Sequence, residues 1–144
     1  MKESNIFEVK IRDTYNYLFS YGGQSEFFKN LCENNKFIGS KCSQCGFVWC
    51  PPRIHCSNCY SSTEFIDLPD QGEIVTQLQL TTPPLTMKKF TSVLSVALIK
   101  LDGSDTCFKA IVIPRGSNLK PGTRVKAKFR KDGTGITTFY FEPV

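Results

Sequence analysis

The sequence has very few of the residues that catalytic sites depend on. It contains one histidine, His55, and neither a GxSxG motif nor a glycine-rich phosphate-binding loop. A Ser-His-Asp set needs a histidine that moves protons, whereas His55 lies between two cysteine pairs. We therefore expect a chain that is not an enzyme by itself.

Long hydrophobic stretches are also missing. No apolar run approaches the roughly 18 residues that a membrane-spanning helix needs, and the polar residues 1–5 lead into no apolar signal core. We expect a soluble, cytoplasmic protein with no membrane partner. With 144 residues, 40% hydrophobic and 22% charged, the chain fits one domain or two small ones that share a core.

Acidic residues are scarce in the second half of the chain. Residues 71–144 hold eleven basic and five acidic side chains, and the whole chain has a net charge of +5. An anionic partner should therefore meet the C-terminal half.

Cysteine is more abundant, and four of the seven cysteines form two CxxC pairs separated by ten residues: Cys42, Cys45, Cys56 and Cys59. Each CxxC turn can present two thiolates to one ion, and two such turns complete the tetrahedral shell of zinc. Four thiolates leave no open coordination position, so we expect structural Zn²⁺. Free thiols or redox-active pairs are the alternatives, but two matched pairs favour zinc.

The other candidate ligands have ordinary explanations. Cys50 and His55 lie between the pairs and could replace a ligand, but the two CxxC turns already fill the shell. Cys32 and Cys107 lie in apolar patterns, and we expect both to be buried thiols.

Residues 1–36 are predicted to form an N-terminal helical hairpin. Tyr15, Leu18 and Phe19 have i, i+3, i+4 spacing, two glycines at 22–23 interrupt the chain, and a second apolar stripe begins at Phe27. The cysteine pairs then define a zinc ribbon over residues 37–68.

Residues 69–144 are predicted to be all β. Five short β segments, separated by turn signals, cover residues 72–82, 92–101, 106–113, 123–130 and 136–141. Five strands with this spacing indicate a five-stranded OB-fold barrel. In the first segment, alternation places four residues on one face: Ile74, Thr76, Leu78 and Leu80. The fold class is thus mainly β with N-terminal helices.

The stretch KCSQCGFVWCPPRIHCSNCYSS, followed by QGEIVTQLQLTTPP, resembles the DUF35 (domain of unknown function) family. The most specific part is CxxCG, then Pro-Pro-Arg, then CxxC, and the segments SVLSVALIKLDG and LKPGTRVKAKF also fit. The resemblance runs from about residue 15 to residue 144. The chain departs from the pattern at Tyr60, where many members have glycine, and by its extra Cys50; neither change touches the four paired cysteines.

The resemblance implies a rubredoxin-like zinc ribbon joined to an OB-fold. It also implies a non-catalytic partner of acyl-CoA enzymes. Members accompany thiolases and related condensing enzymes, in archaea resemble scaffolds that join an acetyl-CoA acetyltransferase to a hydroxymethylglutaryl-CoA synthase, and elsewhere accompany hydratases of acyl-CoA thioesters. We expect an accessory or scaffold subunit of such a complex, with CoA or acyl-CoA as a ligand that it helps to bind.

Six residues are candidates for contacts with CoA or a partner: Arg53, Lys88, Lys89, Phe90, Arg124 and Lys126. The last two belong to an alternating basic stripe, which is also typical of a solvated sheet face. The two lysines and Phe90 lie in a connection that OB-folds commonly use for ligands, although Phe90 alternatively packs on the barrel. Arg53, after two prolines, either faces a phosphate or caps the junction between ribbon and barrel.

Single-stranded nucleic acid is the alternative partner, because zinc ribbons and OB-folds both serve it. Such binding uses aromatic side chains on the sheet as stacking platforms. Residues 92–113 contain only one aromatic residue, Phe108, and the sequence pI of about 8.8 is below that of a strongly basic domain. An acyl-CoA enzyme is therefore the favoured partner.

Overall fold

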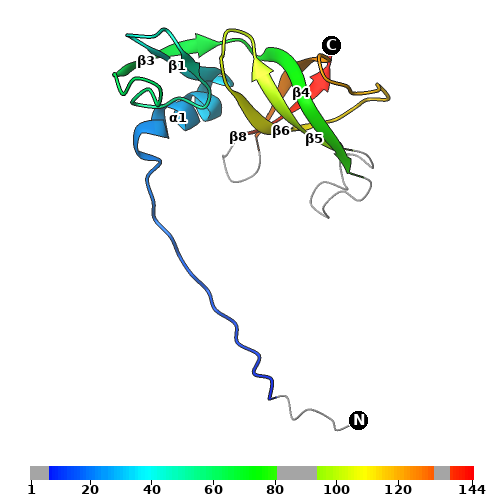
Figure 1. The fold of residues 1–144 in the computed structure, drawn as a ribbon. Helices are drawn as coiled ribbons and strands as arrows, with labels where there is room; N and C mark the ends of the chain where they lie inside the picture. The colour runs from blue at the N-terminus through cyan, green and yellow to red at the C-terminus, as the bar shows by residue number, and fades with distance from the viewer. Residues whose placement is uncertain (1–6, 81–93, 132–136) are drawn as a thin grey trace, which may run out of the picture.

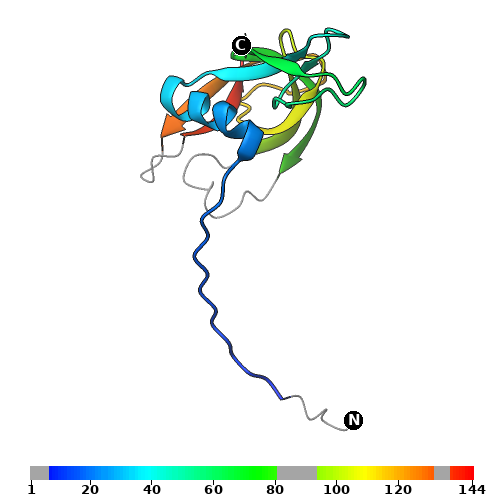
Figure 2. The ribbon, with the colours of Figure 1, turned by 90° about the vertical axis from the view of Figure 1, so that its left-hand side faces the viewer.

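The computed structural model describes residues 7–80, 94–131 and 137–144 (Figure 1). A small helical and zinc-ribbon part lies beside a barrel, and an N-terminal segment extends away from both (Figures 1 and 2). The elements in chain order are η1 (Gly22–Gln24), α1 (Ser25–Asn34), β1 (Phe37–Cys42), β2 (Val48–Trp49), β3 (Thr63–Leu68), β4 (Gln71–Leu80), β5 (Leu94–Leu101), β6 (Cys107–Val112), β7 (Arg124–Lys131) and β8 (Thr137–Pro143). No helix in these described ranges is long and apolar enough to span a membrane.

The predicted helical hairpin is only half present. Residues 7–21, which we call the N-terminal arm, have no regular secondary structure and are exposed (Figure 2). The expected helix around Tyr15, Leu18 and Phe19 was wrong. A helix this short depends on tertiary packing of its apolar face, and these three side chains all remain exposed.

The second helix of the expected hairpin is the observed α1. Its buried side chains are Phe27 and Leu31, which lie four residues apart and so share one face. Asn35 ends the helix in the left-handed region at φ 52°, and its backbone N–H donates to the Asn30 carbonyl. The helix therefore covers the protein with a narrow apolar stripe and leaves its other face in solvent.

The zinc ribbon is a three-stranded antiparallel sheet with strand order β2-β1-β3. The central strand β1 pairs along its whole length with β3, from Phe37 opposite Leu68 to Cys42 opposite Thr63. Because β1 ends at Cys42, the sheet places this cysteine at the start of the turn that contains Cys45.

The C-terminal half forms a closed barrel with strand order β4-β5-β6-β8-β7. Neighbouring strands are antiparallel apart from β6 and β8, which run parallel with Val112 opposite Phe141. Strand β4 starts beside both β5 and β7, and Gly72 makes this possible because a Cβ there would lie 2.3 Å from the Lys100 carbonyl oxygen. The predicted five-stranded OB-fold is confirmed.

Strand β4 corrects one detail of the predicted register. The pairing with β5 shifts between Ile74 and Thr76, and a bulge of this kind reverses the face of every later residue. Ile74 is buried as expected, but Leu78 is 67% exposed, and Gln77 turns inward to donate to the Leu119 carbonyl oxygen at 3.3 Å. The predicted common face of Ile74 and Leu78 was therefore wrong.

One aromatic side chain joins the three parts of the fold. Phe37 on β1 is 1% exposed, and its ring lies between 5.1 and 6.5 Å, centroid to centroid, from rings of α1 and of the barrel. These neighbours are Phe27, Phe108, Phe129, Phe139 and Phe141. The helix, the zinc ribbon and the barrel consequently share one hydrophobic core.

Candidate metal centre and binding surfaces

The two CxxC turns have the same backbone geometry. In the first, the N–H of Gly46 donates to the Cys42 carbonyl at 3.1 Å; in the second, the N–H of Tyr60 donates to the Cys56 carbonyl at 2.9 Å. The residue after each turn has a positive φ, 73° at Gly46 and 59° at Tyr60. Two equivalent turns facing one another give the four sulfurs a near-symmetrical arrangement.

The four sulfurs lie at the spacing that zinc requires. The Sγ atoms of Cys42 and Cys59 are 3.4 Å apart, those of Cys45 and Cys56 are 3.6 Å apart, and all four lie within 4.8 Å of one another. Zn–S bonds of about 2.3 Å in a tetrahedron separate the sulfurs by about 3.8 Å. The cluster therefore fits a structural Zn²⁺ ion with a complete shell of thiolates.

Backbone N–H groups stabilise the thiolate forms of Cys42 and Cys56. The N–H of Cys45 donates to the sulfur of Cys42 at 3.4 Å and is the largest of the effects that lower the pKa of Cys42. At Cys56, burial acts to raise the pKa, but the backbone N–H donors of Asn58 and Cys59 outweigh it, and the pKa is lowered to about 6. Thiolates, which are the metal-binding form, are thus favoured at these two positions.

The thiol of Cys45 is the one of the four whose pKa its neighbours raise most. At Cys45, the backbone N–H of Phe47 favours the thiolate, but the neighbouring sulfurs and burial outweigh it and raise the pKa to about 12. Like charges this close cannot all form unless a positive ion compensates them. A divalent cation at the centre would supply that compensation.

Arg53 braces the ribbon from outside the sulfur cluster. Its guanidinium carbon lies 4.5 Å from the centre of the Trp49 ring, and its Nη1 donates to the Ser57 hydroxyl at 2.7 Å. Its backbone N–H donates to the hydroxyl of buried Ser40 at 2.9 Å. The Trp49 indole nitrogen beneath it is buried and has no hydrogen-bond partner within the described ranges. All of these contacts lie within the ribbon, and the role of Arg53 toward a phosphate or at the junction with the barrel stays a prediction.

The remaining cysteines differ from one another. Cys50 is buried, and burial raises the pKa of its thiol to about 12. Cys32 is half-buried, but Cys107 is exposed at the start of β6, so its predicted burial was wrong. The reason is parity: the next residue, Phe108, packs toward the core, which directs Cys107 to the outer face of the barrel. His55 is exposed, as expected for a loop residue.

The ribbon is fixed to the barrel by hydrogen bonds that the sequence did not reveal. Asp105 accepts from the N–H of Val48 at 2.8 Å through Oδ2, and its own N–H donates to the Val48 carbonyl at 2.9 Å. The Thr106 hydroxyl accepts from the N–H of Cys50 at 2.8 Å and donates to the Cys50 carbonyl at 2.9 Å. The β5–β6 turn thereby pairs with backbone groups of β2 and of the next residue, Cys50, in place of a neighbouring strand.

The predicted cationic residues do not form one cluster in the described part of the chain. Arg124 makes two hydrogen bonds to the carboxylate of Asp102, at 2.7 and 2.5 Å, and this hydrogen bonding lowers the pKa of Asp102. Lys126 lies 3.6 Å from the Asp70 carboxylate. No contact between described residues joins either cation to Arg53. Lys88, Lys89 and Phe90 lie outside the described residues.

Most phenylalanine side chains of the barrel pack into the shared core. Phe108, the one aromatic residue of β6, lies against Phe37, as do Phe129 and Phe139. A side chain that fills the core cannot also stack on a base. Phe108, Phe129 and Phe139 are therefore unavailable as stacking platforms for single-stranded nucleic acid.

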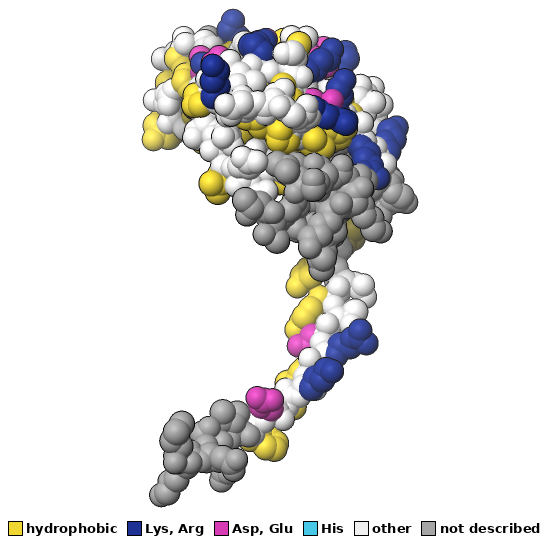
Figure 3. All heavy atoms as spheres, turned by 90° about the vertical axis from the view of Figure 1, so that its right-hand side faces the viewer, with side chains coloured by type: hydrophobic (Ala, Val, Ile, Leu, Met, Phe, Trp, Pro, Cys, Tyr) yellow, Lys and Arg dark blue, Asp and Glu magenta, His cyan; other side chains and the backbone are white. Residues whose placement is uncertain are grey.

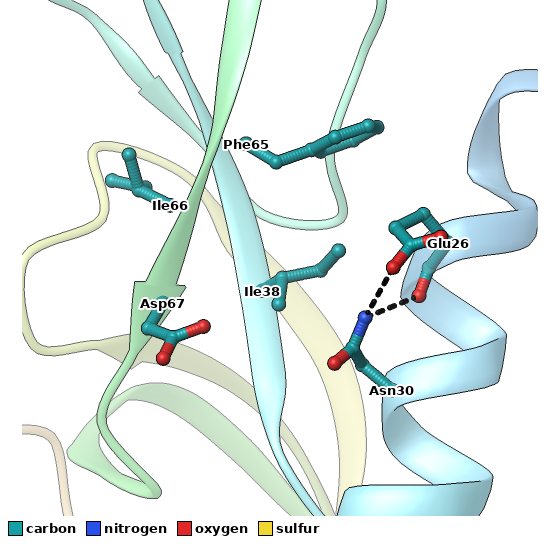
Figure 4. Close-up of a pocket in the computed structure, with 6 residues that line it drawn as sticks. All are labelled: Glu26, Asn30, Ile38, Phe65, Ile66 and Asp67. Atoms are coloured by element: carbon teal, nitrogen blue, oxygen red, sulfur yellow. Dashed lines mark hydrogen bonds between the residues drawn. The ribbon is translucent and has the colours of Figure 1, made fainter.

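A hollow of about 410 Å³ lies between α1 and the sheet (Figure 4). It is lined by Glu26, Asn30, Ile38, Phe65, Ile66 and Asp67. Asn30 is tied to Glu26 by hydrogen bonds to its carbonyl and carboxylate oxygens, at 3.0 and 2.9 Å. No local pattern in the sequence indicates this hollow, because α1 and β3 come together only in the folded chain.

The second CxxC turn offers a stability test. Tyr60 is 84% exposed and occupies the left-handed region that Gly46 fills in the first turn. A non-glycine residue there is disfavoured by about 1–2 kcal/mol, partly offset by the greater freedom of glycine in the unfolded chain. Tyr60→Gly should therefore stabilise the protein by about 0.5–1 kcal/mol in urea denaturation. Gly46→Ala, the matched change, should destabilise it, and equal midpoints for both variants would contradict the geometry.

Comparison with known proteins gives consistent relationships. Residues 30–65 match the family model of the ChsH2 rubredoxin-like zinc ribbon domain. A curated DUF35 domain-containing scaffold protein of Methanocaldococcus jannaschii is 27% identical over 125 residues, which cover 81% of this chain and 88% of the relative. Sequence similarity thus extends beyond the ribbon to most of the chain.

Two solved structures share the fold. The Ltp2-ChsH2(DUF35) aldolase contains a chain with a TM-score of 0.67 and 18% identity, over 92% of this chain and 98% of that one. A DUF35-family protein of unknown function from Sulfolobus solfataricus has a TM-score of 0.61 and 24% identity, over 85% of this chain and 87% of that one. Both similarities span ribbon and barrel together.

Proposed function

We propose that this chain is a member of the DUF35 family, to which its ChsH2-type zinc ribbon and its curated relative point, and that it is a non-catalytic scaffold subunit of an acyl-CoA enzyme complex. The enzyme it accompanies is of the thiolase or hydroxymethylglutaryl-CoA synthase type. The observation that carries the proposal is the similarity over 81% of the chain to a relative described as a scaffold protein. The aldolase that contains a DUF35 chain supports the same role.

The architecture suits a scaffold in physical terms. A single core that includes Phe37 joins ribbon and barrel, and the hydrogen bonds of Asp105 and Thr106 lock the two together. A subunit that is rigid across its parts loses little conformational freedom when it binds, so more of the contact energy becomes affinity. The chain can therefore hold two surfaces in a constant relation.

In this role the metal would stabilise the structure of the ribbon. We propose that Zn²⁺ is held by Cys42, Cys45, Cys56 and Cys59, the four residues whose sulfurs cluster. Four thiolates leave no position for water or substrate, so the ion would stabilise the ribbon and take no part in chemistry. This assignment accounts for the rigid turns without giving the chain a reaction of its own.

A contribution to CoA binding stays a prediction for this chain. Arg124 and Lys126 are each paired with a carboxylate, and Arg53 is engaged with Trp49 and Ser57. A phosphate would have to compete with these existing partners. We propose that the enzyme subunit supplies most of the CoA site and that this chain contributes at its edge.

The proposal predicts which macromolecule the full chain captures. A tagged full-length chain, expressed in its native cell and purified from extract, should retain an acyl-CoA condensing enzyme in a fixed ratio, identified by mass spectrometry. The pair should stay together in high salt, since a scaffold interface depends mainly on packing.

Each other outcome has a defined meaning. Recovery of RNA that dissociates as salt rises would favour the nucleic-acid alternative. Recovery of neither an acyl-CoA enzyme nor RNA would contradict the scaffold role.

A further inference from the structure

The N-terminal arm carries a two-residue alternation of apolar and polar side chains with one exception in each row. Its odd-numbered positions are apolar or aromatic with the single exception of Asp13: Phe7, Val9, Ile11, Tyr15, Tyr17, Phe19 and Tyr21. Its even-numbered positions are polar with the single exception of Leu18. All the apolar members of both rows are exposed. A period of two is typical of a β-strand with one buried face.

The arm is drawn out from the body of the protein and has no regular secondary structure (Figures 1 and 2). Its last residue, Tyr21, is already in the helical region at φ -74° and precedes η1. Among the described residues, nothing accepts from or donates to the backbone of residues 7–19. The rings of Tyr15 and Tyr17 lie 6.2 Å apart and those of Phe19 and Tyr21 lie 5.2 Å apart, so residues two apart share a side. Figure 3 shows hydrophobic side chains along one edge of the arm and basic ones along the other.

The base of the arm is held firmly against the body. The Tyr21 ring stacks on Phe28 of α1 with centroids 3.8 Å apart. Gly23 packs against Ile54 of the ribbon so closely that a Cβ would lie 2.0 Å from the Ile54 Cδ1 atom. The aromatic row thus continues from the arm into the shared core, and its direction of exit is set by contacts on both helix and ribbon.

We propose that residues 7–21 bind the enzyme subunit by adding as a strand to an unpaired edge of its sheet, with the odd-numbered side chains in an adjoining apolar groove. The inference rests on the scaffold role proposed above. Strand addition satisfies the free backbone groups and buries one row of side chains at once. A helix would scatter the odd-numbered positions around its circumference, which argues against folding into a helix on binding. The arm alone cannot be stable, since isolated strands need neighbours.

A second copy of this chain is the less suitable occupant. Its ribbon sheet has two edge strands in the described structure: β2, which has two residues and is bonded to the β5–β6 turn through Asp105, and β3. Strand β3 has six residues and carries Glu64 and Asp67, and charged edges oppose strand addition. The arm reaches about 50 Å when extended, far beyond a six-residue strand. A larger subunit with a long uncharged edge matches the arm better.

The test uses single substitutions on opposite faces of the arm. The binding partner is the enzyme subunit identified in the capture experiment, purified and titrated by calorimetry with the full-length chain. Tyr17→Ser and Phe19→Ser should each weaken binding by about tenfold or more, as for aromatic anchors in interfaces. Leu18→Ser, between them but on the other face, should change affinity by less than about twofold. None of these side chains lies in the core, so all three variants should unfold at the wild-type temperature.

Amide exchange measured by NMR gives an independent reading of the backbone. In an added edge strand, alternate amides point toward the partner, so binding should protect every second residue between 7 and 21. Protection of consecutive amides would indicate a helix and overturn strand addition. A wild-type chain that dimerises through the arm, with dimerisation lost in Phe19→Ser, would overturn the assignment to an enzyme subunit.

The two proposals fail in different ways. If wild-type chain binds the enzyme subunit and the three substitutions bind equally well, the arm has no role and the scaffold proposal stands. If the wild-type chain captures no acyl-CoA enzyme, the scaffold proposal fails and the role of the arm fails with it.

Discussion

Cys42→Ser is expected to abolish metal binding and unfold the zinc ribbon. Cys42 is the last residue of β1 and its sulfur lies 3.4 Å from that of Cys59. Zinc contributes on the order of 10–16 kcal/mol of apparent binding energy to small modules of this kind, and a segment this short cannot replace that energy with buried surface. Since Phe37 on the same strand packs in the shared core, the barrel should lose stability as well.

The measurement combines metal analysis with thermal unfolding of the full chain. Cys107→Ser is the matched control, because Cys107 is an exposed cysteine outside the cluster. The control should keep one zinc per chain and the wild-type unfolding temperature, and a strong chelator should reduce the wild type to the behaviour of Cys42→Ser. Wild-type protein that holds no metal, or that unfolds at the same temperature with chelator, would remove the basis for the zinc assignment.

Phe37→Ala should cause the largest loss of stability of any change away from the metal. Its ring is 1% exposed and touches aromatic rings of α1, β6, β7 and β8. Truncating a buried phenylalanine lowers the free energy of unfolding by about 3–5 kcal/mol, through lost transfer energy and the cavity left behind. The cavity would open where helix, ribbon and barrel meet, so the three parts should also lose their mutual rigidity.

Urea denaturation followed by fluorescence and circular dichroism measures both effects. Phe65→Ala on β3 is the matched control: its side chain is 49% exposed and lies on the ribbon away from the barrel core. It should change stability by less than about 1 kcal/mol. A Phe37→Ala protein with the wild-type midpoint would show that ribbon and barrel are held together without this core.

The zinc cluster could be predicted because its signal is local. Two CxxC turns place their sulfurs by backbone geometry within a few residues, so spacing alone indicates the donor set. The five barrel strands were also predictable, since alternation and turn residues act over short ranges. The missing first helix shows the limit of such patterns: Tyr15, Leu18 and Phe19 fit helical spacing, but their exposed side chains gain nothing from it. The alternation at odd positions was present in the sequence and is the better description of the arm.

The sequence by itself was enough to predict the four clustered cysteines, the barrel strands and the basic character of residues 71–144. Each of these features depends only on residues that are close together in the chain. Only the tertiary structure decided that Phe37 of the ribbon fills the barrel core, that Asp102 and Asp70 neutralise Arg124 and Lys126, and that the bulge after Ile74 exposes Leu78. These features depend on residues far apart in the sequence, whose distances are set by barrel closure and the packing of the ribbon against it. No local pattern encodes such distances.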